Sequence, residues 1–221
     1  MKICDNKKDR RGVLNLNGKF ITFEGPEGSG KTSVIKAVEK YLINKGYDIL
    51  TTREPGGIKI AEDIRNIILD KENIEMDKHA EALLFAASRS QHFHQKIVPA
   101  LEENKIILCD RFIDSSLAYQ GYARGLGIDK VYEINKFGIG NMLPILTIFI
   151  DVPPKVGLER VFSKRDKIDR LDLETLSFHE KVYEGYMLLE QRFPNRFKKV
   201  DGTSSVEKVT EETIRIIETI L

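Results

Sequence analysis

A glycine-rich segment of eight residues constrains this chain more than any other feature of its sequence. The apolar, β-branched run at residues 20–23 precedes the segment, and residues 31–45 carry apolar side chains at helical spacing. Glycines permit tight turns in which backbone N–H groups and the positive end of a helix surround phosphate oxygens. The segment matches the Walker A pattern, which predicts a strand, a phosphate-binding loop and a helix. Its residues are Gly25, Pro26, Glu27, Gly28, Ser29, Gly30, Lys31 and Thr32.

The end of this segment and two strand ends further along the chain suggest how phosphates are handled. Lys31 is expected to reach the β- and γ-phosphates of a nucleoside triphosphate, and the Thr32 hydroxyl is expected to ligate Mg²⁺. The third predicted strand ends in Asp110 and Arg111. An acid there suggests water-mediated Mg²⁺ binding, and an arginine suggests a clamp on the phosphate of an acceptor. Arg53 follows the second predicted strand and would add another cation to that phosphate.

Segments that predict strands alternate with segments that predict helices along the whole chain. This alternation calls for a parallel sheet with helices on both faces and right-handed crossovers. We therefore expect an α/β fold of the P-loop NTPase class with a five-stranded parallel sheet. The predicted strands are residues 20–23, 48–52, 106–109, 146–150 and 197–200. The predicted helices are residues 31–45, 58–69, 78–104, 128–137, 155–162 and 173–193, with a last helix opened by a capping box from Ser204 to Glu207.

The length of 221 residues suits one domain. We predict that residues 1–18, which mix basic and acidic side chains, form a disordered leader. Residues 19–221 are then predicted to form a single P-loop domain. Within it, the basic and polar stretch at residues 163–172 predicts a flexible lid.

Composition disfavours several classes of protein. Charged residues make up 31% of the chain, yet the net charge is only +1, which argues against a large nucleic-acid interface. The two cysteines, Cys4 and Cys109, form neither a disulfide framework nor a zinc pattern, so a reducing, cytoplasmic location is expected. No apolar run approaches the roughly 18 residues of a membrane span, so no membrane association is expected.

A phosphate loop alone leaves GTPases, motor ATPases and kinases open. The third strand does not end in the Asp-x-x-Gly of a GTPase switch, and the Asn-Lys-x-Asp of guanine recognition is missing. Residues 52–57 (TREPGG), 110–112 (DRF) and 116–121 (SLAYQG) together resemble thymidylate kinase, from about Lys19 to the C-terminus. The resemblance implies a nucleoside monophosphate kinase fold and the reaction ATP + dTMP → ADP + dTDP with Mg²⁺. It also implies a homodimer and a role in supplying dTTP precursors.

Two residues match the positions with which this family reads the thymine base, and two more have suitable hydrogen-bonding groups. The resemblance implies that Phe85 stacks on the ring and that Arg89 donates to O4; ordinary core packing of Phe85 is the alternative. Thymine N3–H is a donor that the Gln120 amide oxygen can accept, and Ser116 can help there. Cytosine reverses both polarities, which would leave buried groups unpaired and favours thymine by up to about 10⁴.

The resemblance also assigns the sugar and the lid. Tyr119 is expected under the deoxyribose, where its ring would clash with a 2′-hydroxyl, and Glu27 is expected to accept from the 3′-hydroxyl. The phosphate loop has no arginine at its variable positions, so the cation that stabilises the transferring phosphoryl group must come from elsewhere. Members of the family without a loop arginine place it in the lid. We predict Arg165 for this role, with Arg160 and Arg170 as alternatives.

Two other functions stay open on the sequence. One is a kinase for another monophosphate, such as dUMP or dCMP. The other is a P-loop ATPase, which near-neutral charge disfavours if the partner is a nucleic acid. The four histidines are not expected to form a ligand cluster or to act as a base, because phosphoryl transfer needs little base catalysis.

Overall fold

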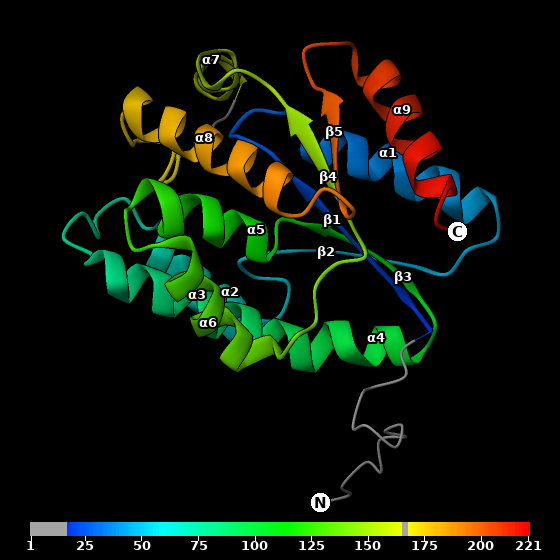
Figure 1. Ribbon diagram of the computed structural model, residues 1–221, viewed down its shortest axis with the longest axis horizontal. Coiled ribbons are helices and arrows are strands. Elements are labelled where there is room, and N and C mark those ends of the chain that lie inside the picture. The colour runs from blue at the N-terminus through cyan, green and yellow to red at the C-terminus, as the bar shows by residue number, and fades with distance from the viewer. Residues whose placement is uncertain (1–16, 165–167) are drawn as a thin grey trace, which may run out of the picture.

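The computed structural model describes residues 17–164 and 168–221, and the predicted leader therefore lies almost entirely outside the described residues. Within them, five parallel strands form one sheet in the order β2-β3-β1-β4-β5 (Figure 1). This confirms the predicted α/β class. The strands are β1 (Lys19–Glu24), β2 (Ile49–Arg53), β3 (Ile106–Asp110), β4 (Leu146–Asp151) and β5 (Phe197–Asp201).

Helices cover both faces of the sheet because successive strand residues point to opposite sides. Phe20 belongs to the apolar cluster under one set of helices, whereas its neighbour Ile21 belongs to the cluster under the other. The helical segments are α1 (Lys31–Asn44), α2 (Lys59–Leu69), α3 (Lys78–His92), η1 (Phe93–Ile97), α4 (Val98–Glu102), α5 (Ile113–Ser116), η2 (Leu117–Ala123), α6 (Ile128–Ile139), α7 (Pro154–Lys164), α8 (Leu176–Arg192) and α9 (Val206–Glu218).

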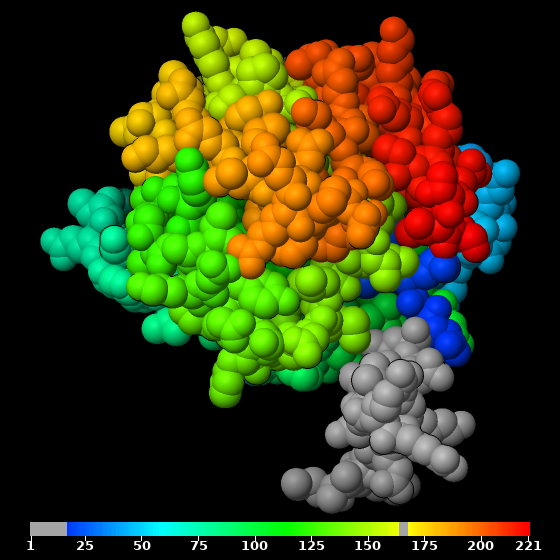
Figure 2. Space-filling view, viewed as in Figure 1, coloured from blue at the N-terminus to red at the C-terminus, as the bar shows by residue number. Residues whose placement is uncertain are grey.

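The smaller helical layer consists of α1 and α9, which lie side by side although they stand at opposite ends of the domain in sequence. Figure 2 shows α9 in red beside the light-blue end of α1. The Tyr41 hydroxyl of α1 donates to the Glu218 carboxylate of α9 at 2.6 Å. The other helices, from α2 to α8, gather mainly on the opposite side, where they surround the larger core.

The long helix predicted at residues 78–104, in which Pro99 indicates a kink, is interrupted. A π-helical segment, η1, separates α3 from α4 just before Pro99. Proline lacks the N–H that an uninterrupted helix would use, and a π segment is one way in which a helix accommodates such a break. Residues 113–123, for which the sequence analysis proposed no helix, form α5 and the π-helical η2.

The predicted capping box is shifted by one residue. Ser205, not Ser204, is the N-cap of α9, and its hydroxyl accepts from the Lys208 N–H. The Ser204 hydroxyl instead donates to Asp201 at the end of β5. Two adjacent serines offer the same capping chemistry, so the sequence alone does not decide between them.

Among the residues that the structure describes, no helix is both long and apolar enough to cross a membrane.

Candidate active site

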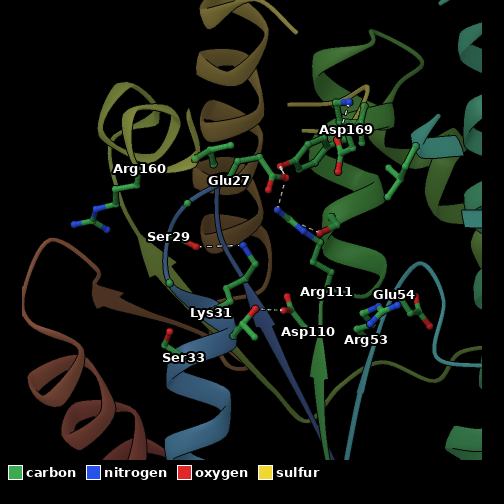
Figure 3. Close-up of a pocket in the computed structure, with 18 of the residues that line it drawn as sticks. Glu27, Ser29, Lys31, Ser33, Arg53, Glu54, Asp110, Arg111, Arg160 and Asp169 are labelled. Atoms are coloured by element: carbon green, nitrogen blue, oxygen red, sulfur yellow. Dashed lines mark hydrogen bonds and ion pairs between the residues drawn. The ribbon is translucent and has the colours of Figure 1, made fainter. Parts of the chain in front are cut away.

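The candidate site is a cavity of about 1510 Å³ beside the carboxyl ends of β1, β2 and β3 (Figure 3). Parallel α/β sheets bind ligands at this edge. A pocket for one small molecule usually measures roughly 300–1,000 Å³, so this cavity has room for two nucleotides. The predicted site residues that line it are Glu27, Gly28, Ser29, Gly30, Lys31, Thr32, Arg53, Phe85, Asp110, Arg111, Tyr119, Gln120 and Arg160.

The phosphate loop follows β1 and depends on glycine where its backbone turns. Gly28 has a φ of +69°, and a Cβ there would lie 2.0 Å from the Gly157 carbonyl oxygen of α7. The Lys31 ammonium donates to the carbonyl oxygens of Gly25 and Pro26 at 3.1 and 3.0 Å, and to the Ser29 hydroxyl. Burial, reinforced by the positive charge of Arg111, lowers the pKa of Lys31 to about 8.

The two predicted Mg²⁺ ligands come from different strands and meet at the floor of the cavity. The Thr32 hydroxyl at the start of α1 donates to the Asp110 carboxylate at the end of β3 over 3.2 Å (Figure 3). No group of three or more His, Cys, Asp and Glu side chains within residues 17–164 and 168–221 could hold a metal by itself. Mg²⁺ is usually held by one or two protein oxygens plus substrate phosphates and water, so this pair fits that ion.

Arg111 is held in place by an acid of the phosphate loop. It has a left-handed backbone, with a φ of +68°, and its N–H donates to the Phe23 carbonyl oxygen of β1. Its Nη2 donates to the Glu27 carboxylate at 2.6 Å, which also accepts from the Tyr119 hydroxyl at 3.0 Å. Glu27 thus ties the loop to the two residues predicted to hold the acceptor phosphate and sugar.

Arg53 reaches the same cavity from the end of β2. Its Nη2 donates to Glu62 of α2 at 2.7 Å, and 53% of the side chain is exposed. Arg53 and Arg111 both line the cavity that the phosphate loop borders. Arg65, which the sequence analysis did not single out, joins them there and donates to the Pro55 carbonyl oxygen.

Arg89 is buried, with only 2% of its surface exposed, and neither Arg89 nor Ser116 is among the described residues that line the cavity. A guanidinium has five N–H donors, and four of them are used inside the protein, which leaves one for a ligand. The acceptors are the Glu54 carboxylate at 2.7 Å, the Ser116 hydroxyl at 2.9 Å, the Phe112 carbonyl oxygen at 2.9 Å and the Asn135 side-chain oxygen. Ser116 therefore positions Arg89 in this structure.

The sequence analysis missed the role of His92, which contacts the carboxylate that holds Arg89 in place. Glu54 bridges Arg89 and His92, whose Nδ1 lies 2.8 Å from the carboxylate, and His92 Nε2 lies 2.8 Å from the Thr52 hydroxyl. His92 is fully buried. Glu54 had a signal, because it belongs to the TREPGG segment, but nothing in the sequence pairs it with a histidine 38 residues away.

Glu24 is a second missed residue. It precedes the phosphate loop, is fully buried, and accepts from the Ser115 and Tyr186 hydroxyls at 2.6 and 2.8 Å. Both hydroxyls also accept from Arg111 Nη1 at 3.1 Å. Burial, followed by the negative charge of Asp114, raises the pKa of Glu24 to about 7.

Phe85 and Gln120 face the cavity above Arg89. Phe85 is 8% exposed and belongs both to the cavity wall and to the larger core, so packing and ligand contact are compatible there. Gln120 lies in η2 and its Nε2 donates to Glu81 of α3 at 2.9 Å.

The three candidate lid arginines differ in position. Arg160 of α7 lines the cavity and donates to the Gly202 carbonyl oxygen. Arg165 lies outside the described residues. Arg170 is 8% exposed and is held by the Ile68 carbonyl oxygen at 2.8 Å and the Glu81 carboxylate at 2.6 Å, as an anchor of the lid would be.

Comparison with known proteins gives one consistent family. The family model described as thymidylate kinase matches residues 23–213. The thymidylate kinase of Clostridium novyi strain NT is 54% identical over 196 residues, covering 88% of this chain and 96% of that protein. That of Oceanobacillus iheyensis is 55% identical over 207 residues, covering 93% and 92%.

A solved structure agrees. The crystal structure of thymidylate kinase from Ehrlichia chaffeensis superposes with a TM-score of 0.75 at 31% identity and covers 90% of this chain and 98% of that one. The family match spans the phosphate loop, Arg53 and Arg111. This chain belongs to the thymidylate kinase family.

Proposed function

We propose that this enzyme transfers the γ-phosphoryl group of ATP to dTMP, and that the cavity residues divide the work between donor and acceptor. One observation carries the assignment: Arg53 and Arg111 line the same cavity as the phosphate loop. Two polyanions that meet end to end need cations on the far side of the acceptor phosphate as well as at the loop. A P-loop ATPase has no such need for an acceptor clamp.

On the donor side, backbone N–H groups from Gly28 to Thr32 hold the phosphates and Lys31 neutralises the β- and γ-oxygens. Thr32 and Asp110 would hold Mg²⁺, which supplies positive charge to the phosphates. Their 3.2 Å hydroxyl–carboxylate contact brings together two oxygens of the type that this ion prefers. No side chain has to act as a strong base, because positioning and charge provide most of the acceleration.

On the acceptor side, Arg53 and Arg111 bind the dTMP phosphate, and Phe85 stacks on the base. Glu27 would turn toward the 3′-hydroxyl once the phosphate takes over Arg111, and Tyr119 packs under the sugar. The remaining N–H of Arg89 would serve thymine O4, and Gln120 would serve N3–H. Burial of both polar groups supports selectivity, because the wrong base would leave them unpaired.

A coupled ADP-release assay tests this function. The protein is given Mg-ATP with dTMP, dUMP or dCMP, or with no acceptor. We expect turnover with dTMP to exceed that with dCMP by several orders of magnitude and acceptor-free hydrolysis to be slow. Equal rates with dTMP and dCMP would favour a broader monophosphate kinase. Hydrolysis that ignores the acceptor would favour an ATPase.

The lid arginine needs its own experiment. We propose Arg165 as the residue that stabilises the transferring phosphoryl group, because Arg170 is engaged as an anchor and Arg160 bonds to Gly202. Arg165→Ala should lower kcat by roughly 10³ while changing the dTMP KM less. Arg160→Ala is the matched control. If Arg160→Ala has the larger effect on kcat, the role moves to α7.

We further propose a homodimer in the cytoplasm, as the family resemblance implies. Large apolar side chains are exposed on α2, α3 and α6, and α3 packs against the other two helices, so an apolar surface there would suit a partner. These side chains are Ile60, Ile67, Leu83 and Phe137, of which Phe137 is 96% exposed. Sedimentation should give twice the mass of the chain, about 51 kDa from the 25.3 kDa monomer. A single 25 kDa species at micromolar concentration would contradict the dimer.

A further inference from the structure

One buried carboxylate, Glu81 of α3, has three partners that come from separate parts of the chain. Its Oε1 accepts from Gln120 Nε2 at 2.9 Å and from Arg124 Nε at 3.2 Å. Its Oε2 accepts from Arg124 Nη2 at 3.1 Å and from Arg170 Nη2 at 2.6 Å. The residue is only 1% exposed. Nothing in the sequence analysis singled it out.

The surroundings of Glu81 keep it ionised. Burial by itself would raise the pKa of Glu81. The hydrogen bonds and the positive charge of Arg124, together with hydrogen bonds from Gln120 and Arg170, outweigh burial and lower this pKa below its ordinary value. Glu174 accepts from Arg124 at 2.5 Å, so two acids and two arginines balance in charge. An ionised carboxylate can accept hydrogen bonds but cannot donate them.

Because the Glu81 carboxylate can only accept hydrogen bonds, it determines the orientation of the Gln120 side-chain amide. The NH₂ group must face Glu81, so the carbonyl oxygen is the polar atom on the opposite side of the amide. Gln120 lines the cavity, and none of the hydrogen bonds among the described residues uses that oxygen. An acceptor there suits the N3–H donor of thymine, whereas cytosine presents an acceptor at N3 and would be repelled.

We propose that Glu81 is a positioning residue for base selection: it fixes the Gln120 amide with its oxygen toward the base and so favours dTMP over dCMP. The inference rests on the proposed reading of thymine N3–H by Gln120. The same carboxylate holds Arg170, and the Arg170 N–H and Nε donate to the Leu69 and Ile68 carbonyl oxygens at the end of α2. Glu81 therefore joins the base pocket to the end of the lid segment.

The test compares kcat/KM for dTMP and dCMP in Glu81→Gln. A neutral amide can donate as well as accept, so Gln120 is free to present either face to the base. We expect the dTMP-to-dCMP ratio to fall about tenfold or more, as the loss of one oriented buried hydrogen bond predicts. The KM for ATP should change less than twofold, which a general structural defect would not spare.

Two further variants separate orientation from stability. Glu174→Gln removes the other acid on Arg124 but leaves the Gln120 contact, so its dTMP-to-dCMP ratio should stay within twofold of wild type. Glu81→Asp keeps the charge for both arginines and withdraws the carboxylate by one methylene, so its ratio should fall by an intermediate amount. This variant supplies the answer even if Glu81→Gln unfolds.

Gln120→Met distinguishes the two ways in which the inference can fail. If Gln120→Met lowers the ratio but folded Glu81→Gln and Glu81→Asp do not, Gln120 reads the base without help from Glu81 and the inference is wrong. If Gln120→Met leaves the ratio unchanged, the proposed base contact itself is wrong, and the inference falls with it.

Discussion

The phosphate loop and the base pocket that we propose (Phe85, Arg89, Ser116 and Gln120) are built in opposite ways. The loop is a continuous stretch of eight residues whose ligand groups are largely backbone N–H groups, shaped by glycines at positive φ. The pocket depends on buried side chains from four places in the chain, since Arg89 alone is held by residues 54, 112, 116 and 135. The loop can be recognised from one continuous sequence motif, whereas the pocket is recognised only once the fold brings distant residues together.

This difference in construction predicts a difference in how mutations act. Lys31 of the loop donates only to two carbonyl oxygens and a hydroxyl, so its removal leaves no buried charge unpaired, and activity and stability should separate there. Each member of the base pocket serves several others, and its removal exposes a buried charge or donor that has no water to replace it. Activity and stability should therefore fall together in the pocket.

The largest effect is expected at Lys31. Lys31→Ala should lower kcat by about 10³ or more, because a buried cation beside the transferring group is lost. The free energy of unfolding should change by less than about 2 kcal/mol, since burial already disfavours the charged amine. A coupled assay and urea unfolding check both values. Normal turnover would remove Lys31 from the phosphate site.

Arg89 offers the opposite behaviour. Arg89→Met should lower kcat/KM for dTMP by roughly 10², because thymine O4 loses its buried donor. It should also cost about 3–5 kcal/mol of stability, since Glu54 is left buried without its arginine. Kinetics and urea unfolding of the same sample test the pair of effects. If KM for ATP rises as much as KM for dTMP, Arg89 does not belong to the base site.

Arg53 is a useful contrast to Arg89, because both are proposed to bind dTMP but the Arg53 side chain is exposed to solvent. Arg53→Gln should raise the KM for dTMP about tenfold through the weaker hold on its phosphate. Stability should change by less than about 1 kcal/mol, because the ion pair with Glu62 is half-exposed to solvent. A loss of stability as large as that of Arg89→Met would contradict the distinction drawn here.

Glu24, which directly precedes the phosphate loop, gives a prediction about stability alone, a pH dependence. Its pKa is raised from 4.5 to about 7, so the folded state binds this proton more tightly than the unfolded chain does. Its contribution to stability therefore falls as the pH rises from about 4.5 to 7. Relative to Glu24→Gln, wild type should lose on the order of 2 kcal/mol between pH 5 and 8 in urea unfolding. A constant difference between the two proteins would show that Glu24 does not titrate in this range.

The sequence predicted the fold class, the parallel sheet and nearly all strand positions, because period-2 and period-3.6 patterns are local. The differences from the structure are also local, and they concern where helices begin and where they are interrupted. The helix predicted at residues 78–104 carries a kink signal at Pro99, but that signal does not specify a π segment, and Ser204 competed with Ser205 as the cap of α9. The helical turns at residues 113–123 carry too little periodicity to be recognised.

By itself the sequence determined the phosphate loop and the family, since both are recognised from short runs of adjacent residues. Only the tertiary structure decided that Glu54 and His92 stand behind Arg89, and that Glu81 joins Gln120 to Arg170. The reason is physical: burial removes water as the alternative partner. A buried charge must therefore find its counterpart wherever the fold brings one, whatever the distance along the chain.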